Sequence, residues 1–177
     1  MADHPAGGRI VDEHADALKR LAGFDPDLTY EAGRPGLSAV QTDSKASPHV
    51  PAIRAAVEAW NRGDWDAALS IGGPNAAEFD ASEDRGEWSG VARGRGSVIR
   101  MWTAVTDSWD SVRYEIDRFI GDGDEVVTCL TGHFAGRDGI EATVHIYWAW
   151  IFEDGWLVRL VTRNEFAKAL EAAGLTE

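Results

Sequence analysis

IEATVHIYWAWIF (residues 140–152), EDG (153–155) and WLVRLVTRNEF (156–166) form the stretch on which the fold depends. The first segment is rich in β-branched and aromatic residues and contains neither Pro nor Gly, which is typical of a β-strand. The second segment is a compact turn, with Gly155 at the point where a positive φ is most needed. Together the three segments predict a long β-hairpin.

The first arm of this hairpin has two different faces, because side chains alternate along a strand. One face carries Val144, Ile146, Trp148 and Trp150. The other carries His145, Tyr147, Ala149 and Ile151. Neither face is polar enough to be left in water, so we expect helices on one side and a partner subunit or further chain on the other.

Length and composition indicate one domain with a short appendage. The chain has 177 residues, enough to bury a core, and its eight Trp either fill a broad core or line an apolar pocket. One Cys allows no internal disulfide, and we find no secretory leader and no apolar run of about 18 residues, so we expect a cytoplasmic protein. A net charge of −13 argues against nucleic acid or a membrane as partner.

Residues 1–49 read as an N-terminal arm. Residues 10–21 have apolar positions at helical spacing and are compatible with a helix. Residues 24–49 hold Pro, Gly, Ser, Asp and Thr with few apolar anchors, which fits either a linker or an ordered arm laid over the main domain. The compact domain is expected to span residues 50–177.

Periodicity and turn residues place the other elements. Helices are expected at 51–61, after an Asp64 cap at 65–69, from 94 to about 109, and at 165–173. Strands are expected at 77–80, 111–120 and 125–135, with a polar loop at 81–93 that is long enough to act as a lid. This order predicts an α+β fold, with helices on one face of a curved antiparallel sheet built as a meander.

Several motifs resemble the SnoaL-like branch of the nuclear transport factor 2-like superfamily. They are AAVEAWNRGD (55–64), EFD (78–80), GVARGR (90–95) before a helix with Trp102, and WIFEDG (150–155). The resemblance covers about residues 50–175. It implies a cone-shaped, strongly bent sheet wrapped around the N-terminal helices, a cystatin-like α+β barrel, with an apolar cavity and commonly a homodimer. Members include cyclases, isomerases, hydrolases, dehydratases and proteins without catalysis, so the reaction has to be argued from the site.

Asp80 and His133 are the candidate catalytic residues. Asp80 matches the position at which ketosteroid isomerases of this superfamily carry the carboxylate that moves a proton, and desolvation there would raise its pKa and its basicity. If Trp148 and Trp150 face into the cone, pairing across the preceding hairpin brings His133 inward as a second acid–base group. The isomerases' phenol and second carboxyl group correspond here to Ala56 and Trp148, so steroid isomerisation with that apparatus is not expected.

The substrate-binding residues expected around this pair come from the sheet, one helix and the loop. They are Trp60, Trp88, Cys129, Thr131, Trp148, Trp150, Thr162 and Asn164. On the outward face, we expect an apolar patch that supports a two-fold homodimer. The residues of that patch are Leu130, Tyr147, Ala149, Ile151 and Val161.

The candidate residues also have structural interpretations. Asp80 can cap the following loop or pair with Arg93 or Arg95, and His133 can be a core residue bonded to a neighbour. Cys129 lies among apolar strand residues, which favours an inert thiol over a nucleophile. His145 falls on the opposite face, so we expect no metal site, and Gly94-Arg95-Gly96 lacks the third Gly of a dinucleotide fingerprint, so we expect no cofactor.

Two classes of function remain open at this point. One is a cofactor-independent cyclase, isomerase or dehydratase that acts by general acid–base catalysis on a hydrophobic, carbonyl-bearing small molecule. The other is a non-catalytic module for an apolar ligand or for dimeric interaction. The first requires Asp80 and His133 to converge on one open cavity, whereas the second tolerates a cone filled by Trp side chains.

Overall fold

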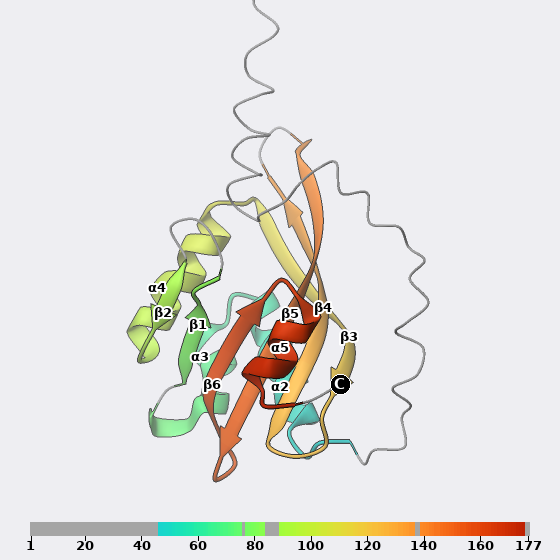
Figure 1. Cartoon of the computed structure of the whole chain (residues 1–177). Helices are drawn as coiled ribbons and strands as arrows, with labels where there is room; N and C mark the ends of the chain where they lie inside the picture. Colours follow the sequence, from blue (N-terminus) through green and yellow to red (C-terminus); the bar gives the residue numbers. More distant parts are fainter. Residues whose placement is uncertain (1–45, 76, 84–88, 137–138, 176–177) are drawn as a thin grey trace, which may run out of the picture.

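The computed structural model describes residues 46–75, 77–83, 89–136 and 139–175. Its strands are β1 (Glu78–Ala81), β2 (Gly90–Ala92), β3 (Ser111–Ile120), β4 (Glu125–Ala135), β5 (Glu141–Glu153) and β6 (Trp156–Arg163). Its helices are α2 (Val50–Asn61), α3 (Trp65–Leu69), the 3-10 segment η1 (Ser70–Asn75), α4 (Arg95–Asp107) and α5 (Phe166–Ala172) (Figure 1). We call the sheet face toward α2, α3 and α4 the inner face, and the face toward α5 the outer face.

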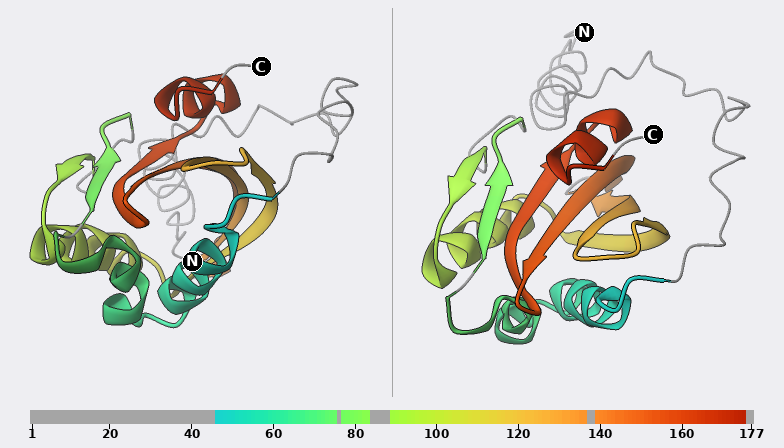
Figure 2. Two further views of the ribbon diagram at one scale, coloured as in Figure 1. Left: turned by 90° about the horizontal axis from the view of Figure 1, so that it is seen from below. Right: turned by 60° about the horizontal axis from the view of Figure 1, so that its bottom comes forward.

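The six strands form one open, curved sheet in the order β2-β1-β6-β5-β4-β3. Strands β3 to β6 are the expected antiparallel meander, which bends around α2 (Figure 2). Strand β1 runs parallel to β6, and β2, which lies inside the predicted loop 81–93, pairs with β1. The α+β fold and the curved sheet are therefore confirmed, while the sheet keeps two free edges and one parallel junction.

The predicted hairpin is confirmed as β5 and β6. Glu153 pairs with Trp156, so the turn consists of Asp154 and Gly155, with φ angles of 49° and 82°. Two consecutive positive φ values define a type I′ turn, whose twist matches that of the flanking strands. This turn sets the register of the two strands that carry the candidate site.

Two irregularities bend the sheet. The β3–β4 register shifts between Ile116 and Arg118, and the β5–β6 register shifts between Ile151 and Phe152. An extra residue in one strand increases local twist and curvature. Gly132 in β4 adds room on the inner face, because a Cβ there would lie 2.8 Å from the Phe134 ring.

Helices α2 and α3 begin where the sequence indicates. Pro51 lies in the first turn of α2, and the Asp64 side chain accepts a hydrogen bond from Ala67 N at 3.0 Å. The buried stripe of α2 consists of Ile53, Ala56, Val57, Ala59 and Trp60. Asn61 then exchanges two hydrogen bonds of 2.8 Å with the backbone of Tyr114, which ties the end of α2 to the edge strand β3.

The residues just before α2 attach to the turn between β3 and β4 and to the end of β5. Ser47 Oγ donates to Gly123 O at 2.7 Å. The His49 ring stacks on Phe152 at 3.8 Å between centroids, and its Nε2 lies 2.8 Å from Asp124 Oδ1. The predicted arm, including the segment 10–21, otherwise lies outside the described residues, as does Trp88 of the predicted lid. Among the helices of the described part, none is long and apolar enough to cross a bilayer.

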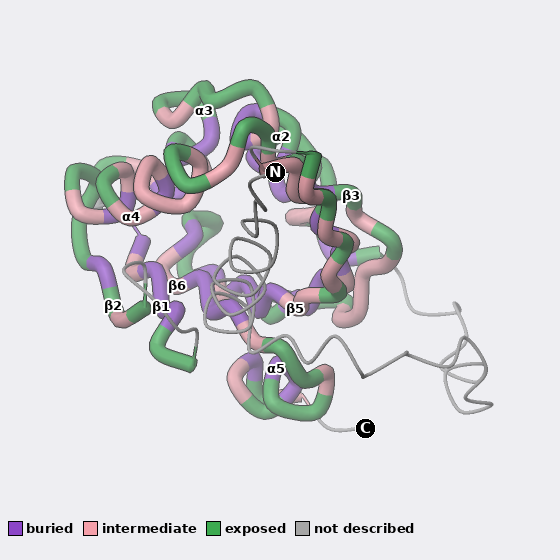
Figure 3. Tube along the Cα trace, turned by 90° about the horizontal axis from the view of Figure 1, so that it is seen from above, coloured by how far each residue is buried: buried purple, intermediate pink, exposed green. Residues whose placement is uncertain are grey.

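Helix α5 covers the outer face of β5 and β6 (Figure 3). Ala169, Leu170 and Ala173 pack on Val127, Ala149 and Val161. The predicted outward patch is correct for Tyr147, Ala149, Ile151 and Val161 but wrong for Leu130, which is 1% exposed in the inner core. The chain's own helix therefore takes the place expected for a partner subunit, and the homodimer stays a prediction.

Candidate functional site

A row of aromatic rings crosses the space between the helices and the inner face. The Trp60 ring centroid lies 5.6 Å from Trp65 and 4.8 Å from Tyr114. The Trp148 centroid lies 4.9 Å from Tyr114 and 5.8 Å from Trp150. These pairs are edge-to-face, the arrangement that aligns the positive rim of one ring with the negative face of the next. The row links α2 and α3 to β3 and β5.

A cavity of about 20 Å³ lies beside these rings. Trp60, Trp102, Trp148 and Trp150 form much of its wall, and aliphatic residues of α2, α3, η1 and β6 form the rest. That volume holds about one water molecule. Trp side chains therefore nearly fill the space enclosed by the sheet. The cavity that remains is much smaller than the open apolar cavity that the resemblance implies.

The wall of the cavity contains one titratable residue, Glu78, among the described residues that line it. Its carboxylate is taken up by two guanidinium groups: Arg93 Nε lies 2.7 Å from Oε2, and Arg159 Nε lies 3.2 Å from Oε1. The second contact is an ion pair without hydrogen-bond geometry. The described wall thus offers a ligand apolar surface and no unpaired charge.

Two Trp–Thr pairs supply polar atoms to the inner face. Trp150 Nε1 donates to Thr128 Oγ1 at 2.9 Å, so this pair is satisfied. Trp148 and Thr162 are aligned across β5 and β6 and are 5% and 2% exposed. Trp148 Nε1 and Thr162 Oγ1 have no hydrogen-bond partner within the described structure. Trp148, Trp150 and Thr162 were predicted from the sequence as binding residues, whereas Thr128 was not, because its inward position depends on the register of β4.

The expected register of β4 is wrong by one residue. Thr128 pairs with Trp148, and Leu130 pairs with Ile146, so the even-numbered residues of β4 face inward. Cys129 pairs with Tyr147, Thr131 with His145, and His133 with Thr143. Because directly paired residues share a face, Cys129, Thr131 and His133 lie on the outer face, away from the cavity.

The outer-face residues of β4 make local polar contacts. His133 Nε2 lies 3.8 Å from Glu115 Oε2, and its side chain is 45% exposed. Thr131 Oγ1 donates to Asp117 Oδ2 at 2.8 Å and lies 3.4 Å from His145 Nδ1. Burial raises the pKa of the Cys129 thiol, the state of an unreactive cysteine. The raised pKa of Cys129 fits its interpretation as an inert thiol, whereas His133 is neither in the cavity nor in the core.

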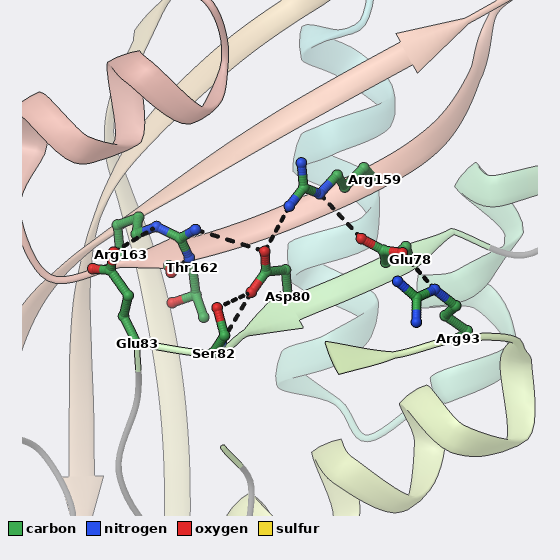
Figure 4. A network of polar contacts seen from close by, with 8 residues as sticks. All are labelled: Glu78, Asp80, Ser82, Glu83, Arg93, Arg159, Thr162 and Arg163. Carbon is green, nitrogen blue, oxygen red and sulfur yellow. Dashed lines mark hydrogen bonds and ion pairs between the residues drawn. The ribbon is translucent and has the colours of Figure 1, made fainter. Parts of the chain in front are cut away.

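Asp80 also lies on the outer face. It is aligned with Val161 beneath α5, whereas its neighbour Phe79 is aligned with Leu160 in the inner core. Figure 4 shows the Asp80 carboxylate between two guanidinium groups of β6. Arg159 donates to Oδ2 at 2.7 Å, and Arg163 lies 3.6 Å from the same atom.

The opposite carboxylate oxygen of Asp80 is bound by Ser82, whose hydroxyl and backbone N–H donate to Oδ1 at 2.6 Å and 3.0 Å. Burial alone would raise the pKa of Asp80. The hydrogen bonds from Ser82 and Arg159 and the charge of Arg163 outweigh burial and lower the pKa from 3.8 to about 2. The raised pKa expected from desolvation is therefore wrong, because Ser82 and two arginines of β6 stabilise the charged form. The contacts with Ser82 fit the alternative that Asp80 caps the following loop, whereas its arginine partners are Arg159 and Arg163 and not Arg93 or Arg95.

Asp80 and His133 are separated across the sheet. They lie on β1 and β4, which are three strand positions apart in the observed order. At about 4.8 Å per strand this separation is roughly 14 Å along the sheet. The two groups therefore do not converge on one cavity, which was the condition set for acid–base catalysis by this pair.

The remaining candidates are spread around the domain. Asn164 is exposed just after β6, and His145 is exposed on the outer face of β5. Of the described residues, no three His, Cys, Asp or Glu side chains form a group that could hold a metal ion. Trp60, Trp148, Trp150 and Thr162 are the predicted binding residues that the fold brings to the inner face.

Comparisons with known proteins agree with this architecture. A family model described as a SnoaL-like domain matches residues 53–160. The crystal structure of TerC co-crystallized with polyporic acid is 22% identical over 72% of this chain and 99% of that chain, with a TM-score of 0.60. An NTF2-like protein of unknown function from Burkholderia pseudomallei K96243 is 22% identical, covering 70% and 95%, with a TM-score of 0.58.

A putative SnoaL-like polyketide cyclase from Shewanella denitrificans OS-217 is 14% identical over 70% of this chain and 97% of that chain, with a TM-score of 0.53. At such identities these solved structures show a shared fold. A search of curated proteins finds no match.

Proposed function

The chain belongs to the SnoaL-like domain family, and on this premise we propose that it binds a neutral, apolar, ring-containing small molecule between α2, α3, α4 and the inner face of the sheet. The observation that carries this proposal is the cavity wall itself. Four Trp rings and aliphatic side chains line it, and the carboxylate of its one titratable described residue is neutralised by Arg93 and Arg159. Such a wall favours apolar rings and disfavours charged ligands.

Binding requires side chains to move, because about 20 Å³ is far less than a ring compound occupies. Ile71 in the cavity wall, and Trp65 and Met101 on α3 and α4, are only partly buried against the core, so moving them exposes less new apolar surface than moving a fully buried side chain. We therefore expect a ligand to enter from the side of α3, η1 and α4. Its binding should rigidify that side of the domain.

The names of structurally similar proteins support a small-molecule ligand. One was co-crystallized with polyporic acid, and another is named a putative polyketide cyclase. For the present chain we propose binding without acid–base catalysis by Asp80 and His133. A carboxyl group with a pKa of about 2 is a weak base at neutral pH, with roughly one molecule in 100,000 protonated.

A neutral fluorescent probe tests the proposal. N-phenyl-1-naphthylamine should bind the wild-type protein and gain fluorescence in the apolar interior. Val57→Ile adds one methylene beside the cavity and should weaken probe binding while keeping or raising the melting temperature. Val91→Ile makes the same change at an exposed position on β2 and is the matched control. Probe binding that is absent in the wild type, or equal in both variants, contradicts the proposal.

A further inference from the structure

The two Trp–Thr pairs of the inner face have the same chemistry but different hydrogen bonding. Trp150 and Thr128 are 2% and 0% exposed and bind each other at 2.9 Å. Trp148 and Thr162 are as deeply buried, at 5% and 2%, yet Trp148 Nε1 and Thr162 Oγ1 are both without a partner in the described structure. The contrast lies within one sheet, between neighbouring strands.

An unpaired polar atom in a protein core reduces stability, because its hydrogen bond to water is lost and not replaced. Val has nearly the same shape as Thr162, and a purely apolar ring in place of the Trp148 indole would also avoid that loss. Native structures leave few buried polar groups unpaired, and those they leave are concentrated at functional sites. The pair is therefore better explained by a bound group than by packing.

The position of the pair agrees with this explanation. Trp148 forms part of the cavity wall, and Thr162 is its aligned partner on β6. Directly paired residues on one face have Cβ atoms about 4.5–5.5 Å apart. An indole N–H only donates, whereas a hydroxyl both donates and accepts. A carbonyl oxygen, with two lone pairs, can accept from both groups.

We propose that Trp148 Nε1 and the Thr162 hydroxyl are the polar anchor of the cavity and bind the carbonyl oxygen of a neutral ring compound. This inference rests on the proposed function and narrows it to ketone- or quinone-like ligands. A carboxylate is disfavoured, because the described cavity wall is apolar and offers no cation to pair with it: Arg93 and Arg159 are already paired with Glu78. A pure hydrocarbon leaves both polar atoms unpaired.

Two ligands of nearly equal shape separate the anchor from general apolar binding: 1-indanone, which has a carbonyl group, and indane, which has none. Calorimetric titration should show that Thr162→Val weakens 1-indanone about 10-fold, the effect of one lost hydrogen bond, and weakens indane less than about twofold. Trp148→Phe also alters the cavity wall, so the expected result is that it weakens 1-indanone about 10-fold more than it weakens indane. In the wild type, 1-indanone but not indane should move the indole N–H resonance of Trp148 downfield. The Trp148→Phe spectrum identifies that resonance.

A stability comparison uses Trp150→Phe as the matched control. Both Trp→Phe changes shrink a buried indole by the same amount, so the difference between them reports the hydrogen bond. Trp150→Phe breaks the bond to Thr128 and should melt about 4 °C below Trp148→Phe. Equal melting temperatures would mean that Trp148 Nε1 already has a partner of similar strength, which overturns the proposal.

The titrations distinguish failure of the polar anchor from failure of the proposed function. If both ligands bind but every variant changes them equally, the anchor is wrong and the proposed function stands. If an internal water is the sole partner of the pair, the Trp148 resonance stays in place on addition of 1-indanone, which also overturns the anchor. If neither ligand binds the wild type, the proposed function fails and the anchor fails with it.

Discussion

Replacing Asp80 with Asn should destabilise the fold rather than remove a catalytic base. The carboxylate of Asp80 is 5% exposed and accepts hydrogen bonds from Ser82 and Arg159, with Arg163 at 3.6 Å. Asparagine keeps the shape but removes the negative charge that pairs with Arg159 and Arg163. It also turns one acceptor oxygen into an N–H₂ group that faces donors. Both effects act against folding at neutral pH.

The size of the effect follows from the pKa of Asp80. That pKa is lowered from 3.8 to about 2, and each tenfold change in acidity corresponds to about 1.4 kcal/mol, so the ionised side chain contributes roughly 2 kcal/mol to the free energy of unfolding. Because the folded-state pKa is the lower one, this contribution is complete above about pH 4. It is lost as the pH falls from about 4 to about 2.

Urea unfolding between pH 2 and pH 7 measures this contribution. The free energy of unfolding of the wild type should exceed that of Asp80→Asn by roughly 2 kcal/mol at pH 6, and this difference should shrink toward pH 2. The contributions of the other carboxylates are the same in both proteins and cancel in the difference. Asp122→Asn, at an exposed position between β3 and β4, is the matched control and should follow the wild type. A difference that is near zero at pH 6, or independent of pH, would refute the stabilising role of the contacts that Asp80 makes with Ser82, Arg159 and Arg163.

Three further predictions concern the edges of the domain. Ending the chain at Glu165 removes α5 and uncovers the apolar cluster around Val127, Ala149 and Val161; light scattering should then show self-association, and a monomer with an unchanged melting temperature contradicts the role of α5. A chain that starts at Ser47 should fold and melt like the full chain, since Ser47 keeps its contact with Gly123; an insoluble product would make the arm part of the domain. For the full chain a homodimer is predicted, and a monomeric mass by light scattering at micromolar concentration would contradict it.

Much of the fold was predictable because its signals are local. The β5–β6 hairpin follows from a strand composition interrupted by Asp154 and Gly155, both of which adopt positive φ. Helix α2 follows from Pro51 and an apolar stripe, and α3 follows from the cap at Asp64. The inward positions of Trp148 and Trp150 also follow from alternation within one strand.

The register of β4 could not be read from alternation. Val126, Val127, Thr128 and Leu130 are all buried, so both faces of the strand are apolar and hydrophobic pattern does not choose between them. The inward set includes Gly132, which has no side chain to mark it. A one-residue error then moves every side chain to the other face, which is why His133 was expected in the cavity.

The surroundings of Asp80 depend on contacts between distant parts of the chain. Arg159, which donates a hydrogen bond to it, is 79 residues away in sequence and reaches it only because β1 lies beside β6. The arginines near Asp80 in the sequence, Arg93 and Arg95, were predicted instead. The packing of α5 on the outer face could not be predicted for the same reason. The residues of this short helix do not indicate which strands it contacts.

The parallel junction of β1 with β6 has a consequence for the order in which the domain assembles. Strands β3 to β6 are joined by short connections, whereas β1 must find a partner about 80 residues further along the chain. Closing a longer loop costs more entropy, so the meander should form first and β1 with β2 should dock onto it late. In the native state the same two strands should be the first to separate, as a subglobal unit whose amides exchange with deuterium ahead of those shared by β4 and β5.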